Sequence, residues 1–141
     1  MVNFLLDTNV ISEWTRPRPE PLVVDWLAGA DEDGLYLSVI SLAELRRGVE
    51  LLPTGRRRQQ LASWLADDLT TRFEDRILAI DVPVADAWGR VMVAAQSAGI
   101  TLDSMDGWLA ATAQVHDLVL VTRNSRDFER LDMAILNPWL T

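Results

Sequence analysis

Short apolar runs alternate along this chain with longer segments in which apolar residues recur every three or four positions. The short runs are typical of buried strands, and the longer segments predict amphipathic helices. Strands that alternate with helices favour an α/β domain with a mainly parallel sheet. Strands are expected at residues 3–6, 35–39, 77–80 and 118–122, with a fifth, edge strand at 133–136. The main helices are expected to begin at Leu22, Ser41, Arg56, Pro83 and Asp103.

The length of 141 residues is typical of one compact domain, and no internal repeat or shift in composition marks a boundary. Residues 1–141 are therefore expected to form a single domain. No apolar run approaches the length of about 18–20 residues that a membrane helix needs. The first residues also lack the basic segment of a signal peptide. We therefore expect a cytoplasmic protein without a membrane partner.

Composition excludes several kinds of active site. All 13 basic residues are arginines, so the lysines of a P-loop and of a Schiff base are both missing. The absence of cysteine excludes thiol nucleophiles, zinc fingers, iron–sulfur sites and disulfides. His116 is the one histidine, so a multi-histidine metal site is impossible and a Ser-His-Asp triad would have to use it. Oxygen ligands are the remaining means of binding a metal ion.

Acidic and amide residues follow several of the expected strands. Asp7 follows the first strand, Glu44 lies in the first turn of the helix after the second, and Asp106 lies in the first turn of an alanine-rich helix. Asn124 and Asp127 follow the fourth strand. The carboxyl ends of parallel strands share one edge, where ligand sites of open α/β sheets lie. Carboxylates that converge there repel one another, and a hard divalent cation such as Mg²⁺ or Mn²⁺ relieves the repulsion.

Each of these residues also has a purely structural interpretation. Asp7 is placed to cap the helix that follows it, and Glu44 has the spacing of a capping-box partner of Ser41. Asp106 has the position of a first-turn acid in a helix capped by Asp103, where negative charge is favourable. The two polar residues after the fourth strand are ordinary turn residues. The pattern alone leaves both interpretations open.

Four stretches of the chain carry a family resemblance. They are FLLDTNVIS at 4–12, SVISLAELRRGVELL at 38–52, DGWLAATAQVHDLVLVTRNSRDFERL at 106–131 and LNPW at 136–139. Their combination, order and spacing resemble those of PIN-domain proteins, specifically toxin ribonucleases of the VapC/FitB type. The resemblance covers nearly the whole chain. It implies a three-layer α/β/α sandwich with a mainly parallel sheet of four to five strands.

The resemblance also assigns site residues. Asp7, Glu44 and Asp106 match three acids of the family motif, which implies that Asp7 and Asp106 bind Mg²⁺ directly and Glu44 binds it directly or through water. Mn²⁺ is expected to substitute. Family members place a fourth acid either where this chain has Asn124 or where it has Asp127. The amide at the first position leaves the role of each residue open.

Three further residues match polar positions near the family site: Thr8, Asn9 and Thr122. They are expected to orient ligands or water, although each also suits a helix cap or the end of a strand.

The implied activity is Mg²⁺-dependent hydrolysis of RNA phosphodiester bonds by a metal-activated water, which makes the chain an endoribonuclease. The implied biological role is the toxin of a type II toxin–antitoxin module, with a small cognate antitoxin as partner and a homodimer or dimer-based assembly. Arg46, Arg47 and Arg123 lie near the expected site in sequence. They are expected to bind the RNA backbone, since basic side chains supply most phosphate contacts.

Other functions compete with this hypothesis. A catalytically silent PIN-like module would bind RNA or a protein without cleaving anything, although retention of Asp7, Glu44 and Asp106 argues against loss of activity. A phosphatase of the haloacid-dehalogenase type would use Asp7 as nucleophile, but that class needs a second aspartate where this chain has Asn9. A phosphoacceptor receiver domain needs a lysine, which this chain lacks.

Overall fold

A five-stranded parallel sheet forms the centre of the computed structural model, which describes residues 1–140. The spatial order is β3-β2-β1-β4-β5, and every neighbouring pair is parallel. The strands are β1 (Phe4–Leu6), β2 (Leu35–Ser38), β3 (Ile77–Leu78), β4 (Val119–Val121) and β5 (Ile135–Leu136). The predicted parallel sheet is therefore confirmed, including the edge position of its last strand. The edge strands β3 and β5 are each two residues long, which is shorter than the predicted 77–80 and 133–136.

Helical segments connect the strands. They are α1 (Thr8–Ser12), η1 (Glu13–Thr15), α2 (Pro21–Gly29), η2 (Glu32–Gly34), α3 (Val39–Leu51), α4 (Arg56–Ser63), η3 (Trp64–Leu69), α5 (Thr70–Arg72), η4 (Glu74–Arg76), α6 (Val82–Ser97), α7 (Ser104–Val115) and α8 (Ser125–Glu129). The single helix predicted over residues 56–71 is a continuous helical run whose middle, η3, is π-helical. Within residues 1–140 no helix is long and apolar enough to cross a membrane.

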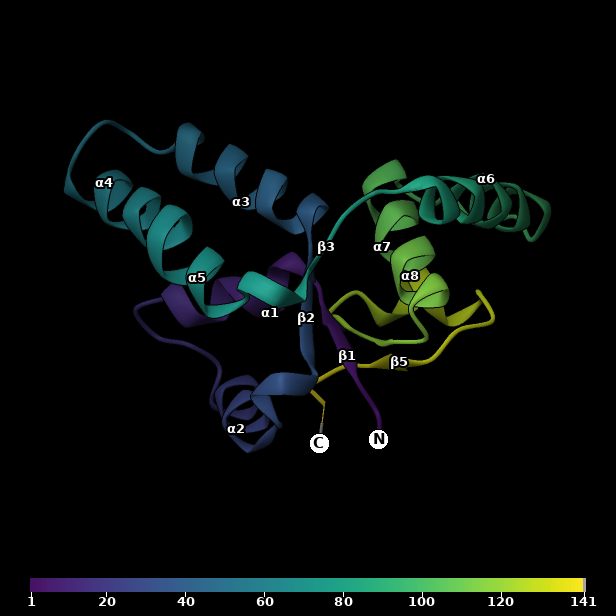
Figure 1. The fold of residues 1–141 in the computed structure, drawn as a ribbon, viewed down its shortest axis with the longest axis horizontal. Helices are drawn as coiled ribbons and strands as arrows, with labels where there is room; N and C mark the ends of the chain where they lie inside the picture. Colours follow the sequence, from purple (N-terminus) through teal and green to yellow (C-terminus); the bar gives the residue numbers. More distant parts are fainter. Residues whose placement is uncertain (141) are drawn as a thin grey trace.

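Apolar residues pack on both faces of the sheet. Leu5 and Leu120 lie in one buried cluster together with residues of α6 and α7. Leu6 and Val121, their neighbours along the strands, lie in a second cluster with residues of α1, α2, α3 and η3. This alternation follows from the pleat, which points successive side chains to opposite faces. Figure 1 shows α3, α4 and α5 on one side of the strands and α6 and α7 on the other, so the predicted three-layer arrangement is confirmed.

The start of α3 differs from the prediction, and the difference matters for Glu44. The helix begins at Val39 and is capped by Ser38, whose Oγ accepts a hydrogen bond from the N–H of Ile40 at 3.0 Å. Ser41 instead lies inside the helix, is fully buried, and its Oγ has no hydrogen-bond partner within residues 1–140. The predicted capping box of Ser41 and Glu44 is therefore wrong, because strand pairing ends at the earlier of two serines. Helix capping does not explain Glu44.

The first turn of α7 is held close to α6. Asp103 caps α7 as predicted, and the indole Nε1 of Trp88 on α6 donates to the carbonyl oxygen of Ser104 at 3.2 Å. Gly107 lies against α6 so tightly that a Cβ there would come within 2.5 Å of Met92 Sδ. A larger residue at position 107 would force the helices apart. This packing positions the turn that carries the Asp106 side chain.

Candidate active site

Asp7 lies where the central strand β1 ends. Its N–H donates to the carbonyl oxygen of Val121 on β4 at 2.9 Å, and its side chain is buried. One carboxylate oxygen, Oδ1, accepts from the N–H of Thr8 at 2.6 Å, and the other accepts from Thr122 Oγ1 at 2.7 Å. Asp7 therefore caps α1 and also presents a carboxylate whose orientation is held by two neighbouring strands.

The segment after β4 is tied to the same carboxylate. The fully buried Thr122 accepts a hydrogen bond from the N–H of Asn124 at 3.0 Å while donating to Asp7. Asn9 donates to Asp7 Oδ2 at 3.4 Å and accepts from the N–H of Arg123 at 3.3 Å. These contacts fix the position of the loop that follows β4 relative to the end of β1.

Glu44 and Asp106 approach Asp7 from opposite sides of the sheet. Glu44 lies on α3, and its Oε1 accepts a hydrogen bond from Thr8 Oγ1 at 2.8 Å. Asp106 lies in the first turn of α7. Both side chains are partly buried. Thr8 therefore links the two acids next to β1, since its N–H binds Asp7 and its hydroxyl binds Glu44.

Crowding of negative charge shows in the protonation of Asp106. Burial raises the pKa of this carboxyl from 3.8 to about 7, and the charges of Asp7, Asp103, Asp127 and Glu44 add to the rise in that order. The charges of these four carboxylates therefore disfavour the ionised form of Asp106. At neutral pH about half of the Asp106 side chains are therefore protonated when no cation is nearby.

Asp7 balances opposing effects. Burial raises the pKa of its carboxyl, the hydrogen bonds from Thr122 and Thr8 lower it, and the charge of Glu44 raises it again. The net pKa lies above the usual value of 3.8. A buried carboxylate that keeps its charge beside another acid needs a positive partner, and hydrogen bonds supply only part of that need.

The structure brings together the acids expected from the sequence. The charges of Asp7, Glu44 and the exposed Asp127 of α8 all raise the pKa of Asp106. Asn124 is exposed, and its main-chain N–H supports Thr122. Sequence reasoning treated Asp103 only as a cap and missed its charge at this site. Its position three residues before Asp106, on the same helical turn, was the available signal.

Arginine does not neutralise this cluster. Within residues 1–140 no arginine forms an ion pair with Asp7, Glu44 or Asp106. Arg46 on α3 is 3.9 Å from Glu50, and the Arg123 guanidinium lies 5.4 Å from the centre of the Trp139 ring. Among the described residues, the arginines expected to bind RNA therefore form no ion pair with these three acids.

The donor set suits a hard divalent cation. The polar atoms of the site are carboxylate and hydroxyl oxygens. Mg²⁺ is usually held by one or two carboxylates together with several waters. As the side chains stand, no three His, Asp or Glu residues within positions 1–140 form a group that could hold an ion. The arrangement therefore fits a cation bound by two carboxylates and water better than a closed protein cage.

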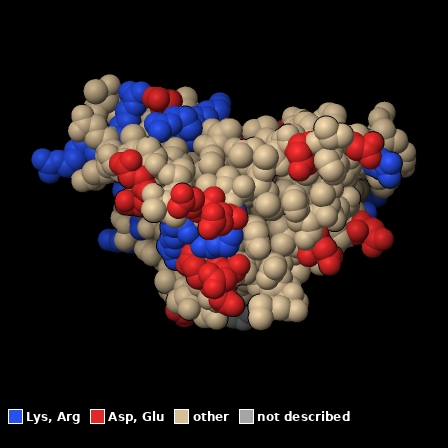
Figure 2. Space-filling view, in the orientation of Figure 1, with Lys and Arg blue, Asp and Glu red and all other residues tan. Residues whose placement is uncertain are grey.

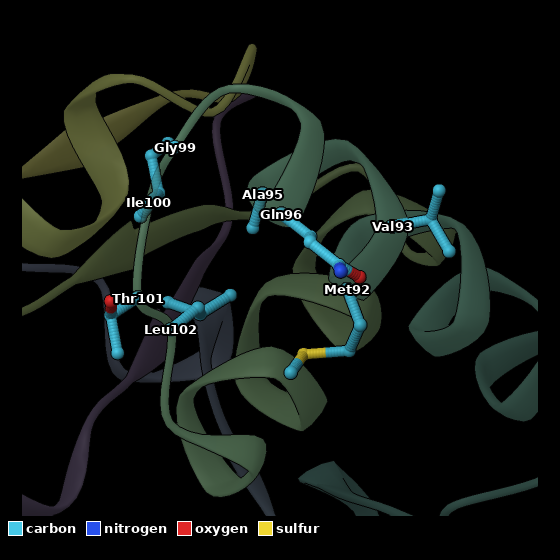
Figure 3. Close-up of a pocket in the computed structure, with 8 residues that line it drawn as sticks. All are labelled: Met92, Val93, Ala95, Gln96, Gly99, Ile100, Thr101 and Leu102. Carbon is cyan, nitrogen blue, oxygen red and sulfur yellow. The ribbon is translucent and has the colours of Figure 1, made fainter.

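Two cavities flank the acids. One of about 210 Å³ is lined by Thr8 and Glu44 at one end and by apolar residues of α3 and α4. Another of about 470 Å³ is lined by Arg123, Asn124 and Asp127. A third, of about 450 Å³, lies between the end of α6 and the segment leading to α7, and its lining contains no acidic residue (Figure 3). The sheet edge that carries the acids is therefore a better candidate for the active site than the cavity in Figure 3.

Relatives of this chain share its whole length. A family model described as PIN domain matches residues 4–133. Toxin FitB of Neisseria gonorrhoeae is 42% identical over 135 residues, which are 96% of this chain and 97% of that protein. A VapC ribonuclease of Sinorhizobium fredii is 35% identical over 135 residues, 96% of each chain.

Solved structures agree with the sequence relatives. The crystal structure of FitAcB from Neisseria gonorrhoeae matches with a TM-score of 0.93 at 41% identity and covers 98% of this chain and 99% of that chain. VapBC-5 from Mycobacterium tuberculosis, a member of the VapBC family of toxin-antitoxin systems, matches with a TM-score of 0.66 at 26% identity and covers 96% and 97%. By fold and by sequence, this chain belongs to the PIN-domain family.

Proposed function

We propose that this chain is the toxin of a type II toxin–antitoxin module and a Mg²⁺-dependent endoribonuclease. One observation carries the proposal: buried and partly buried carboxylates crowd the end of the central strands without an arginine partner. The names of the relatives, a toxin and a VapC ribonuclease, support the activity and the biological role. The VapBC-5 structure, which comes from a toxin-antitoxin system, supports a small antitoxin as partner.

Asp7 and Asp106 would hold Mg²⁺ directly, with Mn²⁺ as a substitute, and Glu44 would hold it directly or through water. When bound, the cation polarises a phosphoryl oxygen and makes water a better nucleophile. Thr122 and Thr8 keep the Asp7 carboxylate in one orientation through hydrogen bonds to its two oxygens. Asp106 gives up its proton when the cation binds, since a positive charge favours the ionised carboxyl.

Asp127 supplies the fourth acid in this proposal. Its charge contributes to the raised pKa of Asp106, which supports a place for its carboxylate close to that acid. Asn124 has a supporting role, because its main-chain N–H holds the hydroxyl that binds Asp7.

RNA would lie across the acidic edge. Arg46 and Arg47 on α3 and Arg123 after β4 are exposed, so their guanidinium groups are available to phosphate oxygens. Arginine suits this task because its planar guanidinium forms paired hydrogen bonds with phosphate. A homodimer or dimer-based assembly and a cytoplasmic location remain predictions from the family resemblance.

A PIN module without catalytic activity is the second candidate, and one observation favours it. Within residues 1–140 no three acidic side chains are already arranged to hold an ion. Metal binding separates the two candidates. A nuclease should gain thermal stability from Mn²⁺ through Asp7 and Asp106, whereas a silent module should gain little.

Cleavage of pooled cellular RNA by the purified protein tests the proposal. Reactions would contain Mg²⁺, Mn²⁺ or EDTA and would compare the wild type with Asp7→Asn and Asp106→Asn. Asp68→Asn is the matched control, because Asp68 is exposed on η3 and takes no part in the cluster. We expect fragments with 5′-phosphates that disappear in EDTA and decrease by about 100-fold or more in both site variants.

Two outcomes would contradict the proposal. Cleavage that persists in both site variants would show a contaminating ribonuclease or a wrong site. Absence of cleavage with every metal, together with no stabilisation by Mn²⁺, would favour the silent module.

A further inference from the structure

The hairpin of α3 and α4 concentrates positive charge in an acidic protein. Residues 45–63 hold five arginines and one acidic residue, a net charge of +4. The other 122 residues hold eight arginines and twenty acidic residues, a net charge of −12. Figure 2 shows basic side chains gathered over α3 and α4. The arginines of this hairpin are Arg46, Arg47, Arg56, Arg57 and Arg58.

Contacts within the fold account for only part of this positive charge. Arg46 and Arg58 share one exposed acid, Glu50, and Arg57 donates to the carbonyl oxygen of Thr15 at 2.7 Å. Arg47 and Arg56 form no ion pair within residues 1–140. Helix stability does not explain the three arginines that begin α4 either, because positive charge is unfavourable in the first turn of a helix.

The basic hairpin begins at the acidic site and leads away from it. Glu44 lies on α3, and Arg47 follows one turn later on the same helix. From Glu44 to the end of the helix at Leu51 is about 10 Å at 1.5 Å per residue. α4 then starts beside that end, after a short connection. A stacked strand that rises about 3.4 Å per nucleotide along its axis would cross this distance in about three nucleotides.

A nuclease of this composition needs such a surface. Its net charge is −8, and the acids around Asp106 repel any phosphodiester that approaches them. Binding must therefore come from positive charge outside the site, on a surface that the same strand can reach. We propose that the α3–α4 hairpin is a docking surface for the RNA backbone, with Arg56 and Arg58 binding phosphates several nucleotides from the scissile bond. This inference rests on the proposed ribonuclease function.

Salt dependence of RNA binding provides the test. Binding of a labelled, random-sequence single-stranded RNA would be measured in EDTA, so that no cleavage occurs, from about 50 mM to about 200 mM KCl. Arg56→Gln/Arg58→Gln is compared with Arg18→Gln/Arg90→Gln, which has the same net charge. The pairs are matched, because Arg58 and Arg90 each contact an exposed acid whereas Arg56 and Arg18 are exposed without an ion pair within residues 1–140.

We expect the slope of log K against log [KCl] to become less steep by about 1.4 for Arg56→Gln/Arg58→Gln, which is two lost phosphate contacts at about 0.7 each. The control pair should keep the wild-type slope. With Mg²⁺ restored, the hairpin variant should show a raised KM and an unchanged kcat, since its two arginines lie away from the acids.

Equal slopes for the two double variants would overturn the proposed docking surface for RNA. The polyanion that fits this hairpin would then be an acidic polypeptide. RNA binding with the expected change in slope but without cleavage would support the docking surface while the proposed catalysis failed. Absence of RNA binding at every salt concentration would overturn both.

Discussion

Two groups of carboxylates on this molecule have opposite surroundings. Glu32 contacts Arg72 at 2.7 Å and Arg76 at 3.4 Å, and hydrogen bonding to Arg72 is the main reason that the pKa of its carboxyl is lowered. Asp106 has acids around it instead, and burial together with their charge raises its pKa to about 7. The first carboxylate has its positive partners within the chain. The second lacks them, which is the condition under which a carboxylate binds an external cation.

The contacts among Glu32, Arg72 and Arg76 hold two segments of the chain together. The Arg76 side chain is only 15% exposed and donates to the carbonyl oxygens of Leu35 at 2.7 Å and Arg72 at 2.8 Å. Its guanidinium also lies 4.7 Å from the centre of the Phe73 ring. These contacts join η4 to the start of β2. Opposite charges here pair and hold η4 against β2, whereas the carboxylates at the sheet edge have no arginine partner within residues 1–140.

Replacement of Arg76 by Met should give the largest loss of stability. The Arg76→Met variant keeps the apolar stem but leaves the carbonyl oxygens of Leu35 and Arg72 without the Arg76 donor and removes one of the two arginines that contact Glu32. We expect the free energy of unfolding in urea to fall by about 3 kcal/mol. Stabilisation of the folded protein by Mn²⁺ should not change, because the acidic edge is untouched. A loss below about 1 kcal/mol would show that this group is no more than a surface ion pair.

Replacement of Asp106 by Asn should have the opposite sign. The folded-state pKa is about 7 and the ordinary value is 3.8, so the folded protein binds more protons between these pH values. Wild-type stability without metal should therefore decrease as the pH rises from about 4 to about 7. Asp106→Asn removes this decrease and should gain about 1–2 kcal/mol at about pH 8, after allowance for solvent screening.

Urea unfolding in EDTA over this pH range measures the effect. The gain of Asp106→Asn over the wild type should grow up to about pH 7 and then level off. Added Mn²⁺ should stabilise the wild type but not the variant. Asp68→Asn, at an exposed position, serves as control. A wild-type stability that is constant across this range would contradict the crowding of negative charge at the site.

Periodicity was sufficient to predict most of the fold. Apolar runs predicted all five strands, because parallel strands that are covered on both faces read as continuous apolar segments. The error at Ser41 has a local cause. Ser38 and Ser41 are equally good caps by residue type, and only the pairing of β2 with its neighbours decides where the strand ends. Long-range pairing of this kind leaves no signal in a short window of sequence.

The site was predictable in a different way. Asp7, Glu44 and Asp106 follow from the rule that parallel strands end at one edge, combined with the family resemblance. The hydrogen bond between Thr8 and Glu44 joins residues 36 positions apart, so no local pattern contains it. Asp103 is identified as a cap from its type and position, and its charge adds to the raised pKa of Asp106. Residue types were thus predictable, whereas their interactions depended on packing.

Replacement of Glu32 by Gln should have the smallest effect. Because Arg72 and Arg76 lower the pKa of the Glu32 carboxyl, its contribution to stability is present above the ordinary value of 4.5 and is lost as the pH falls through the folded-state pKa. Its side chain is 40% exposed, so solvent screens the ion pairs. We expect Glu32→Gln to lose no more than about 1 kcal/mol at neutral pH.

Urea unfolding at about pH 7 and about pH 3 checks this, because the difference between wild type and Glu32→Gln should be smaller at the lower pH. High salt should also reduce the difference, since exposed charges are screened. The pH trend is the opposite of that expected for Asp106, where the wild type is at a disadvantage at high pH. If Glu32→Gln instead stabilised the protein as the pH rose, Glu32 and Asp106 would show the same pH trend. The lack of arginine around Asp106 would then no longer indicate cation binding.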